Sequence, residues 1–598
     1  MRTVTTDVLV VGAGPAGLTA SALLAQFGVP AVTLSRHLGT APQPRATITN
    51  QRTVEVFRDM GIEERVREIG VPLTSVHHNV LATSLTGQEI YRYLSYGTGD
   101  RAADYALSSP CEGYNAAQHA LEPVLLRTAV ERGADVRFSH ELLEIEETHE
   151  HVVARILDRV TTEEYLIRAR YAIAADGGRS RVAEQLGIAF EGQTALMHMI
   201  NAWIEVDLTE HTAYRPGVIY TILQPGGESW IGSGSFLNVQ PWNDWVLIRQ
   251  YDPAEGEPDT SDAAVVKAAR SLIGDREVPV RVKGTSKWEV NNVVAREYRR
   301  GRVFLAGDAA HRHTPSGGLG SNTSIQDSYN LAWKLAFVLK GQAGDALLES
   351  YHEERQPVGK HVVDRTMQNL KNQAAVGKAL GLRHGQSSEE GWESLRQLFS
   401  DEPGAAERRD ALDDAVALQH YRSNAHGVDI GQRYASRAVV DDGTPFPEPT
   451  RDPELYYHPT THPGAHLPHA WLEQERRRLS TLDLAGHGRF CLIVGIGGAP
   501  WAESAASLST ELGIDLPVFA IGYRCEYDDV VGAWAALREI DDRGALLVRP
   551  DQHIAWRSFS RPQSPRNALA AALRQALARE DTLAARDRGK STASTADV

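Results

Sequence analysis

Cysteine is scarce in this sequence of 598 residues: Cys111, Cys491 and Cys525 are the three examples, and they lie far apart. They form neither a CxxC pair nor a cluster with the spacing of metal ligands, so we expect no disulfide framework, no thiol redox pair and no metal site. Long apolar runs are also missing, because none approaches the roughly 18 residues that a membrane-spanning helix requires. The N-terminal apolar stretch contains Asp7 and runs directly into a glycine-rich turn, unlike a signal peptide. We therefore predict a cytoplasmic protein that does not span a membrane.

Positive charge is in deficit, with a formal net charge of −15 and no basic stripe that carries interleaved aromatic residues. Such a chain repels nucleic-acid phosphates on average, so we expect no nucleic acid among its partners. Hydrophobic residues make up 42% and charged residues 23%, which is ordinary globular composition. At about 150 residues per domain, the length favours a multidomain protein.

The first informative motif lies near the N-terminus. Residues 8–11 (VLVV) form a short apolar run of buried-strand type, and residues 12–17 (GAGPAG) then open a helix. In this GxGxxG pattern the first glycine permits a tight turn, the second lets the backbone approach a pyrophosphate, and the third allows helix and strand to pack closely. The pattern predicts a dinucleotide site, with contacts from Gly12, Gly14, Pro15, Ala16 and Gly17.

A second predicted strand, residues 31–34, ends on Ser35 and Arg36. The dinucleotide fingerprint expects Asp or Glu there to hold a ribose hydroxyl. That acid is missing, but Ser35 can still hydrogen-bond a hydroxyl and Arg36 could cover the adenosine region. We therefore predict both as cofactor contacts.

Two further apolar runs end on an acidic turn. Residues 171–175 lead to Asp176 and two glycines, and residues 303–306 lead to Gly307 and Asp308. After Asp308 comes the glycine-rich stretch 315–322 (PSGGLGSN), followed by a strongly helical segment that Gly341 can cap. A carboxylate at a strand end, close backbone N–H groups and the positive end of a helix dipole together suit an anionic cofactor. The sequence thus predicts strand, cofactor-binding loop and helix in this region.

Gly307-Asp308, Pro315, the 317–322 loop and residues 330–334 (NLAWK) together resemble the second FAD motif of the group A flavin monooxygenases, the single-component aromatic hydroxylases. Residues 311–313 and 318–327 are most similar to the 2,4-dichlorophenol 6-monooxygenase branch. Segments at 457–459, 463–471, 480–483 and 547–557 resemble the C-terminal domain of phenol hydroxylases. The resemblance implies an α/β fold with a Rossmann-like FAD-binding domain of p-hydroxybenzoate hydroxylase type, a β-sheet substrate domain, and a thioredoxin-like domain without CxxC.

The predicted domain boundaries follow from the motifs and from changes in strand and helix pattern. We assign residues 1–77, 105–189 and 289–370 to the FAD-binding domain, and 78–104 and 190–288 to the substrate domain. We predict a helical connector at 371–430, a thioredoxin-like domain at 431–578 and a disordered tail at 579–598.

The resemblance also implies the cofactor contacts. Asp308 would hold the ribityl hydroxyls, Asp176 would lie near the pyrophosphate and ribose, and Arg45 and Gln118 would reach the flavin. Backbone amides near Leu319, Gly320, Ser321 and Asn322 and the dipole of the following helix would stabilise the reduced flavin. Pro315 and Gly318 are the other predicted cofactor contacts in this loop.

Four residues are candidates for the chemistry itself. The carbonyl of Pro315 would face the substrate and the oxygen-bearing side of the flavin. His313 is open to two readings, a structural hydrogen bond or proton transfer. Tyr220 and Arg249 of the substrate sheet would orient the substrate, although the sequence alone does not tell which strand face they occupy.

The resemblance predicts an enzyme that uses FAD, NADPH or NADH, and O2 to hydroxylate a phenol-type ring ortho or para to its hydroxyl through a flavin C4a-hydroperoxide. The chain has no second dinucleotide fingerprint, so the nicotinamide cofactor would bind transiently. We also expect a homo-oligomer. Two alternatives stay open: a flavin-dependent halogenase, although residues 242–245 (WNDW) lack the Trp-x-Trp-x-Ile-Pro motif, and a non-catalytic flavin-binding redox sensor.

Overall fold

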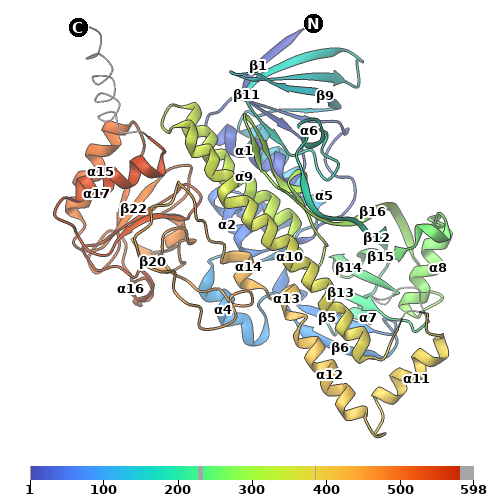
Figure 1. The fold of residues 1–598 in the computed structure, drawn as a ribbon. Coiled ribbons are helices and arrows are strands. Elements are labelled where there is room, and N and C mark those ends of the chain that lie inside the picture. The colour runs from blue at the N-terminus through green and yellow to red at the C-terminus, as the bar shows by residue number, and fades with distance from the viewer. Residues whose placement is uncertain (1, 227–232, 384, 580–598) are drawn as a thin grey trace, which may run out of the picture.

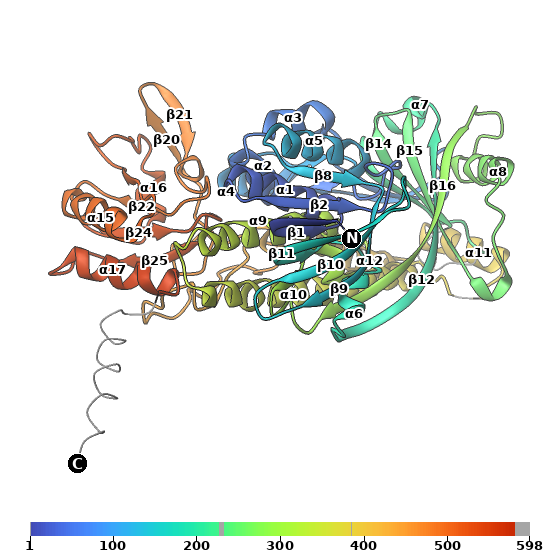
Figure 2. The same ribbon diagram turned by 90° about the horizontal axis from the view of Figure 1, so that it is seen from above.

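The computed structural model describes residues 2–226, 233–383 and 385–579. Most of the predicted tail, 580–598, lies outside the described residues. The described residues form two large sheets of eight strands each and three smaller sheets of four, three and two strands. The long helices α9 (Gly320–Leu339) and α10 (Glu349–Ala379) run through the middle of the molecule (Figures 1 and 2).

The N-terminal sheet has a parallel centre. Its strand order is β17 (Arg299–Arg300), β18 (Val303–Leu305), β11 (Glu164–Ala174), β1 (Thr3–Val11), β2 (Ala31–Ser35) and β8 (Asp135–Phe138), and β9 (His140–Glu147) and β10 (Val152–Asp158) join through β11. In the register of β1, β11 and β18, Val11 lies opposite Ala174 and Ala174 opposite Leu305. The three motif turns therefore leave the sheet at the same edge, since parallel strands share their carboxyl ends.

Helices cover this sheet and complete its core. Helix α1 (Pro15–Gln26) packs against α9 and against α5 (Gln118–Glu131). Nine consecutive residues of α1, from Ala16 to Leu24, are buried, as expected for a helix enclosed on several sides. Strand β3 (Ile48–Thr49) comes just before α2 (Gln51–Asp59) in the chain. It forms a small sheet with β7 (Tyr114–Asn115), which also pairs with β4 (Val71–Pro72).

The second large sheet is mostly antiparallel. Its strand order is β19 (His311–Arg312), β16 (Arg281–Ala295), β12 (Phe190–Glu205), β15 (Asp244–Tyr251), β14 (Gly234–Gln240), β13 (Gly217–Ile222), β5 (His78–Ala82) and β6 (Glu89–Leu94). One face packs against α8 (Asp262–Ile273). Strand β19 follows Asp308 within a few residues and pairs with β16, which ties the cofactor loop directly to this sheet.

Helices lead from the second sheet to the C-terminal domain. Helix α10 continues to Ala379, past the predicted domain boundary at 370, and α11 (Ser388–Leu398), α12 (Ala405–Ala417), α13 (His420–Ser423) and α14 (His426–Ile430) follow. The C-terminal sheet has the order β23 (Val518–Ala520), β22 (Cys491–Val494), β24 (Ala545–Val548), β25 (Ile554–Ser558), with α15 (Ala499–Leu512), α16 (Ala533–Leu537) and α17 (Pro565–Ala576). Strands β22 and β23 are parallel and the other pairs antiparallel, which is the thioredoxin-like arrangement that the sequence predicts.

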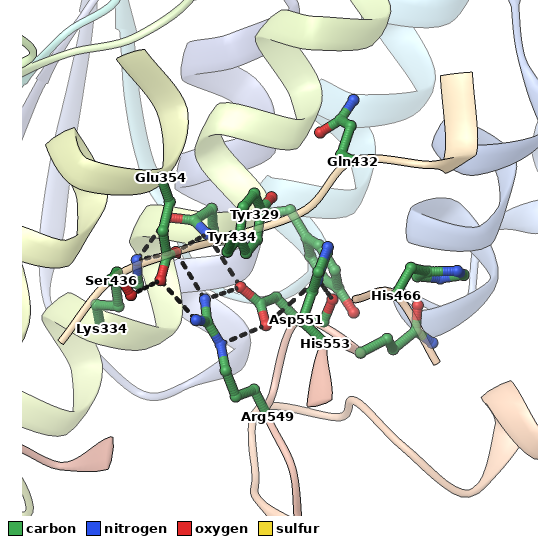
Figure 3. A network of polar contacts seen from close by, with 12 residues as sticks. Tyr329, Lys334, Glu354, Gln432, Tyr434, Ser436, His466, Arg549, Asp551 and His553 are labelled. Carbon is green, nitrogen blue, oxygen red and sulfur yellow. Dashed lines mark hydrogen bonds and ion pairs between the residues drawn. The ribbon is translucent and has the colours of Figure 1, made fainter. Parts of the chain in front are cut away.

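A buried ionic network attaches the C-terminal domain to the central helices (Figure 3). Lys334 of α9 donates to Glu354 of α10 at 2.6 Å, Arg549 donates to Glu354 at 2.6 Å, and Arg549 also donates to Asp551 at 2.6 Å. The four side chains are at most 2% exposed. None of the helices within the described ranges combines the length and hydropathy that crossing a membrane requires.

Candidate active site

The first turn of α1 is open to a ligand. Gly12 has a φ of +113°, and a Cβ there would lie 2.0 Å from the carbonyl oxygen of Ala175, so only glycine suits the turn. Gly14 caps α1 without a side-chain hydrogen bond, and Pro15 begins the helix. Gly14, Ala16 and Gly17 thus place uncapped N–H groups at the edge where the three turns meet, as pyrophosphate binding requires, and Pro15 fixes the first turn of the helix without adding a donor.

Asp308 lies on the neighbouring turn with its carboxylate unused. It accepts no hydrogen bond from any residue in the described ranges. Its side chain is accessible to water, but many protein atoms lie around it. This partial enclosure raises the pKa of Asp308, while His311, Arg312 and Arg45 partly offset the effect. An acceptor without a partner at this position fits a cofactor that offers hydroxyl groups.

The Asp176 carboxylate is hydrogen-bonded within its own turn. Its carboxylate accepts hydrogen bonds from the Ser180 hydroxyl at 2.6 Å and from the Val182 amide at 3.3 Å, which closes the turn into α6 (Arg181–Gln185). Burial raises the pKa of Asp176 and these hydrogen bonds oppose the shift. The carboxylate shapes the third turn at the shared edge, and a direct contact with the cofactor stays a prediction.

Gln118 and Arg45 lie beside each other. The Gln118 amide N–H donates to the Ala46 carbonyl at 2.8 Å, and its side chain donates to Glu122 at 2.6 Å. Arg45 is exposed. Ser35 ends β2 and accepts a hydrogen bond from the His37 amide at 3.3 Å, and Arg36 is exposed next to it. The structure therefore brings all four predicted side chains to the rim of the same edge, and their contacts with the cofactor stay predictions.

The glycine-rich loop ends in the uncapped first turn of α9. Gly320, Ser321 and Asn322 begin the helix after Gly318 and Leu319, and no side chain caps it. Asn322 anchors the loop, because its side chain donates to the Ile48 carbonyl at 2.9 Å and accepts from the Asn50 amide at 3.0 Å. Free N–H groups at this helix end can stabilise negative charge on a flavin.

Pro315 and His313 are held by the loop itself. The Pro315 carbonyl accepts a hydrogen bond from the Gly318 amide at 3.2 Å, so one of its lone pairs closes a turn. His313 donates from Nδ1 to the Thr314 carbonyl at 2.8 Å. Burial lowers the pKa of His313 to about 4, so the ring is neutral near pH 7 and its Nε2 can only accept. This favours the structural reading of His313 over proton donation.

A buried cluster that the sequence did not indicate supports this loop. Asp327 of α9 accepts hydrogen bonds from the Gly307 amide at 3.0 Å, His311 Nε2 at 2.8 Å and Arg355 Nε at 2.8 Å. Burial alone would raise the pKa of Asp327, but Arg355 and His311 hold it below its usual value. Asp327 therefore joins the Asp308 turn to α9 and α10.

The predictions for Tyr220 and Arg249 are corrected by the structure. Tyr220 is fully buried against α8 with Trp245 and Leu247, and its hydroxyl donates to the Arg215 carbonyl at 2.7 Å. Arg249 shares the strand face of Trp245 and Leu247, because alternate residues of β15 point the same way. Both side chains lie on the sheet face away from the cofactor loop.

The opposite sheet face meets the loop. Ile219 and Leu237 pack with Tyr96 and with Ile48, the residue to which Asn322 bonds. Beside them, Asp429 of α14 accepts a hydrogen bond from the Asn50 side chain at 2.9 Å, and it accepts no other from the described part of the chain. Burial raises the pKa of Asp429 to about 7, against the smaller opposing effect of Asn50. No local motif marks Asp429, since only folding brings α14 next to the loop.

Comparison with known proteins agrees with this geometry. Residues 5–366 match the model of the FAD binding domain, and residues 460–579 match that of the aromatic-ring hydroxylase C-terminal domain. The chain belongs to the FAD-binding aromatic hydroxylases. This confirms the predicted family, fold class and cofactor: the chain is a FAD-dependent aromatic monooxygenase.

Relatives match over nearly the whole chain. A 2,4-dichlorophenol 6-monooxygenase from Delftia acidovorans is 44% identical over 574 residues, covering 96% of this chain and 98% of the relative. A phenol 2-monooxygenase from a Pseudomonas species (strain EST1001) is 40% identical over 570 residues, covering 95% and 92%.

Two solved structures are also similar. The flavin-dependent monooxygenase PieE, in complex with FAD and substrate, has a TM-score of 0.93 at 43% identity and covers 97% of this chain and 100% of that chain. Aklavinone-11 hydroxylase with FAD and aklavinone has a TM-score of 0.78 at 30% identity, with coverage of 96% and 99%.

Proposed function

We propose that this monooxygenase hydroxylates a phenol-type ring, ortho or para to the existing hydroxyl, with NADPH or NADH and O2 as cosubstrates. The observation that carries the proposal is the hydrogen-bonded chain from the cofactor loop to a carboxyl group, Asn322 to Asn50 to Asp429, beside the apolar surface of Ile48, Ile219 and Leu237. An aromatic ring fits the apolar surface, and a ring hydroxyl can donate to the carboxylate. The phenol and chlorophenol monooxygenases among the relatives support this choice of substrate.

The chain supplies position and charge for this reaction. The uncapped first turns of α1 and α9 would hold the pyrophosphate and the flavin ring of FAD, and Asp308 would accept from its ribityl hydroxyls. Bound there, FAD supplies the oxygen-transfer chemistry. Neutral His313 keeps positive charge away from the loop near pH 7.

Asp429 is our candidate for the residue that activates the phenol. With a pKa of about 7 it is partly ionised at neutral pH, so it can accept the hydrogen of the phenol. A phenol that donates to a carboxylate pushes electron density to its ortho and para carbons, where an electrophilic oxygen attacks.

The test compares a phenol with its methyl ether at matched ring substitution. We expect coupled NAD(P)H oxidation and hydroxylated product with the phenol, and only uncoupled oxidation with peroxide release from the ether. Product is measured by mass spectrometry and peroxide by a coupled assay. Equal coupled turnover of the two compounds would eliminate activation through the hydroxyl.

We further propose that the protein is a homo-oligomer that works in the cytoplasm, where its nicotinamide cosubstrate is available. Exposed apolar side chains on the C-terminal domain support the oligomer: Ile496, Tyr523, Val530 and Val531 are between 56% and 79% exposed. Sedimentation velocity of the natural protein and of Val531→Glu tests this. A monomer at micromolar concentration in both would exclude it.

A further inference from the structure

A cavity lies where the substrate sheet meets the C-terminal end of α10. Thr221 of β13 lies opposite Leu81 of β5, and Leu81 lies opposite Tyr91 of β6, so the three residues share one sheet face. Val376 and Leu380 of α10 complete the wall. Figure 1 shows the end of α10 beside β5, β6 and β13, with α12 and α13 next to it. The wall thus combines aliphatic side chains and Tyr91 with polar side chains, which are those of Thr221, Gln373, Gln419 and Arg422.

Two polar side chains in this wall have no partner. Among the described residues, neither the Arg422 guanidinium nor the Gln373 amide forms a hydrogen bond, and Arg422 forms no ion pair. No Asp or Glu is among the described residues that line the cavity. Arg422 is thus a positive charge in the cavity wall without a counter-ion from the described residues.

The neighbouring tyrosines do not replace that counter-ion. Burial raises the pKa of Tyr91, Tyr93 and Tyr96, and Arg422 offsets only part of the shift. All three hydroxyls are therefore neutral at physiological pH. The half-buried Arg422 guanidinium is therefore free to pair with an anion, and its planar fork matches a carboxylate. Gln373 can add a third hydrogen bond from its NH2 group.

The cavity is close to the cofactor loop. Asn369 of α10 donates to the Ser316 carbonyl at 3.1 Å, and Gln373 follows one turn later on the same face, which is about 6 Å along the helix axis. The carbonyl oxygen of Arg422 lies 3.5 Å from the position of a Cβ on Gly317. A substituent on a ring at the loop can therefore reach the unpaired groups.

We propose that this cavity binds a carboxylate on a short side chain of the aromatic substrate, with Arg422 as the anchoring cation and Gln373 as a second donor. The inference rests on the proposed function, because it places the ring of that substrate at the cofactor loop. It narrows the substrate from phenols in general to phenols that carry an acidic chain of two or three carbons.

The experiment uses the FAD-loaded enzyme and a matched pair of ligands, a 3-(hydroxyphenyl)propanoate and its primary amide. Binding is titrated through the change in flavin absorbance, and KM is measured for coupled hydroxylation. The natural enzyme should bind the carboxylate roughly tenfold or more tightly than the amide. Arg422→Gln should remove that preference and leave amide binding within about twofold, and Arg422→Lys should restore part of it. Arg396→Gln, on an exposed arginine of α11, is the matched control and should keep the preference.

The two readouts separate the inference from the proposed function. Equal binding of the carboxylate and the amide by the natural enzyme, or an equal loss of both in Arg422→Gln, overturns the inference even if simple phenols are hydroxylated. A preference for the carboxylate that depends on Arg422 supports the inference even if no phenol is converted, in which case the proposed function fails alone.

Discussion

Buried charges occur in two arrangements in this protein, and the contrast separates structure from function. At the junction with the C-terminal domain, Lys334, Glu354, Arg549 and Asp551 lie within hydrogen-bond distance of one another and neutralise each other (Figure 3). Burial alone would raise the pKa of Glu354, but Arg549 and Lys334 hold it well below its usual value. These charges need no ligand.

Near the cofactor loop the charges are unpaired. Asp308, Arg422 and Asp429 form no ion pair with any residue in the described ranges, and Asp429 has one neutral hydrogen-bond donor. Arg422 and Asp429 are half-buried, and burial of a charge without a partner lowers stability. The network holds the domains together, whereas the unpaired groups are those that we propose to bind cofactor and substrate.

The largest effect is expected from breaking the network. Arg549→Met leaves Glu354 and Asp551 without their main counter-ion and should lower the free energy of unfolding by about 3–5 kcal/mol. Arg437→Met removes a half-exposed pair with Glu353 and should cost about 0–1 kcal/mol. Urea unfolding followed by tryptophan fluorescence measures both. Similar costs for the two variants would contradict the structural role of the network.

The next effect concerns the cofactor. Asp308→Ala removes the acceptor for the ribityl hydroxyls, and since a hydrogen bond to a charged group contributes about 1.5–3 kcal/mol, FAD affinity should fall by roughly 10- to 150-fold. The protein should be purified colourless, whereas Asp401→Ala, an exposed control, should stay yellow. Flavin fluorescence during titration of the apoprotein gives the dissociation constant. Unchanged affinity in Asp308→Ala would show that its carboxylate does not face FAD.

A third prediction concerns pH. Because folding raises the pKa of Asp429 from 3.8 to about 7, the folded state binds the proton more tightly than the unfolded state, and this group lowers stability as pH rises from 3.8 to 7. Asp429→Asn should therefore be more stable than the natural protein above pH 7, by on the order of 2–4 kcal/mol, with no difference below pH 3.8. Unfolding at a series of pH values measures the difference. A difference independent of pH would show that Asp429 does not titrate in this range.

The same substitution, Asp429→Asn, also tests the proposed role of Asp429 in catalysis. If Asp429 accepts from the phenol, the loss of kcat/KM on the acidic side of pH 7 in the natural enzyme should be absent in Asp429→Asn, and the plateau should be about 10²- to 10⁴-fold lower. An unchanged pH profile would assign the activation to another group.

The smallest effect is expected in the C-terminal domain. Cys491 and Cys525 are both free, and burial raises the pKa of each thiol, so neither is a reactive thiolate. Cys491→Ala combined with Cys525→Ser should keep hydroxylation within about twofold, because neither thiol takes part in a redox step. A large loss of activity with unchanged circular dichroism would contradict this.

The cofactor and the framework that holds it can be predicted from local sequence motifs. The turns at Gly12 and Asp308 and the start of α9 are recognisable because each depends on residues that are adjacent in the chain: an apolar strand, a glycine or carboxylate turn, and a helix end. Such local requirements leave a pattern that can be recognised without a partner.

The proposed substrate site, by contrast, depends on contacts between distant parts of the chain. Tyr220 and Ile219 are neighbours on one strand, and which of them faces the loop depends on the side to which α8 packs, which no pattern within β13 shows. Asp429 and Arg422 come from short helices far along the chain. They can be recognised as candidate site residues only when α13 and α14 are seen to fold back beside Asn50 and Gly317. The cofactor site is built from contiguous motifs, whereas the proposed substrate site is built from side chains that meet through packing alone.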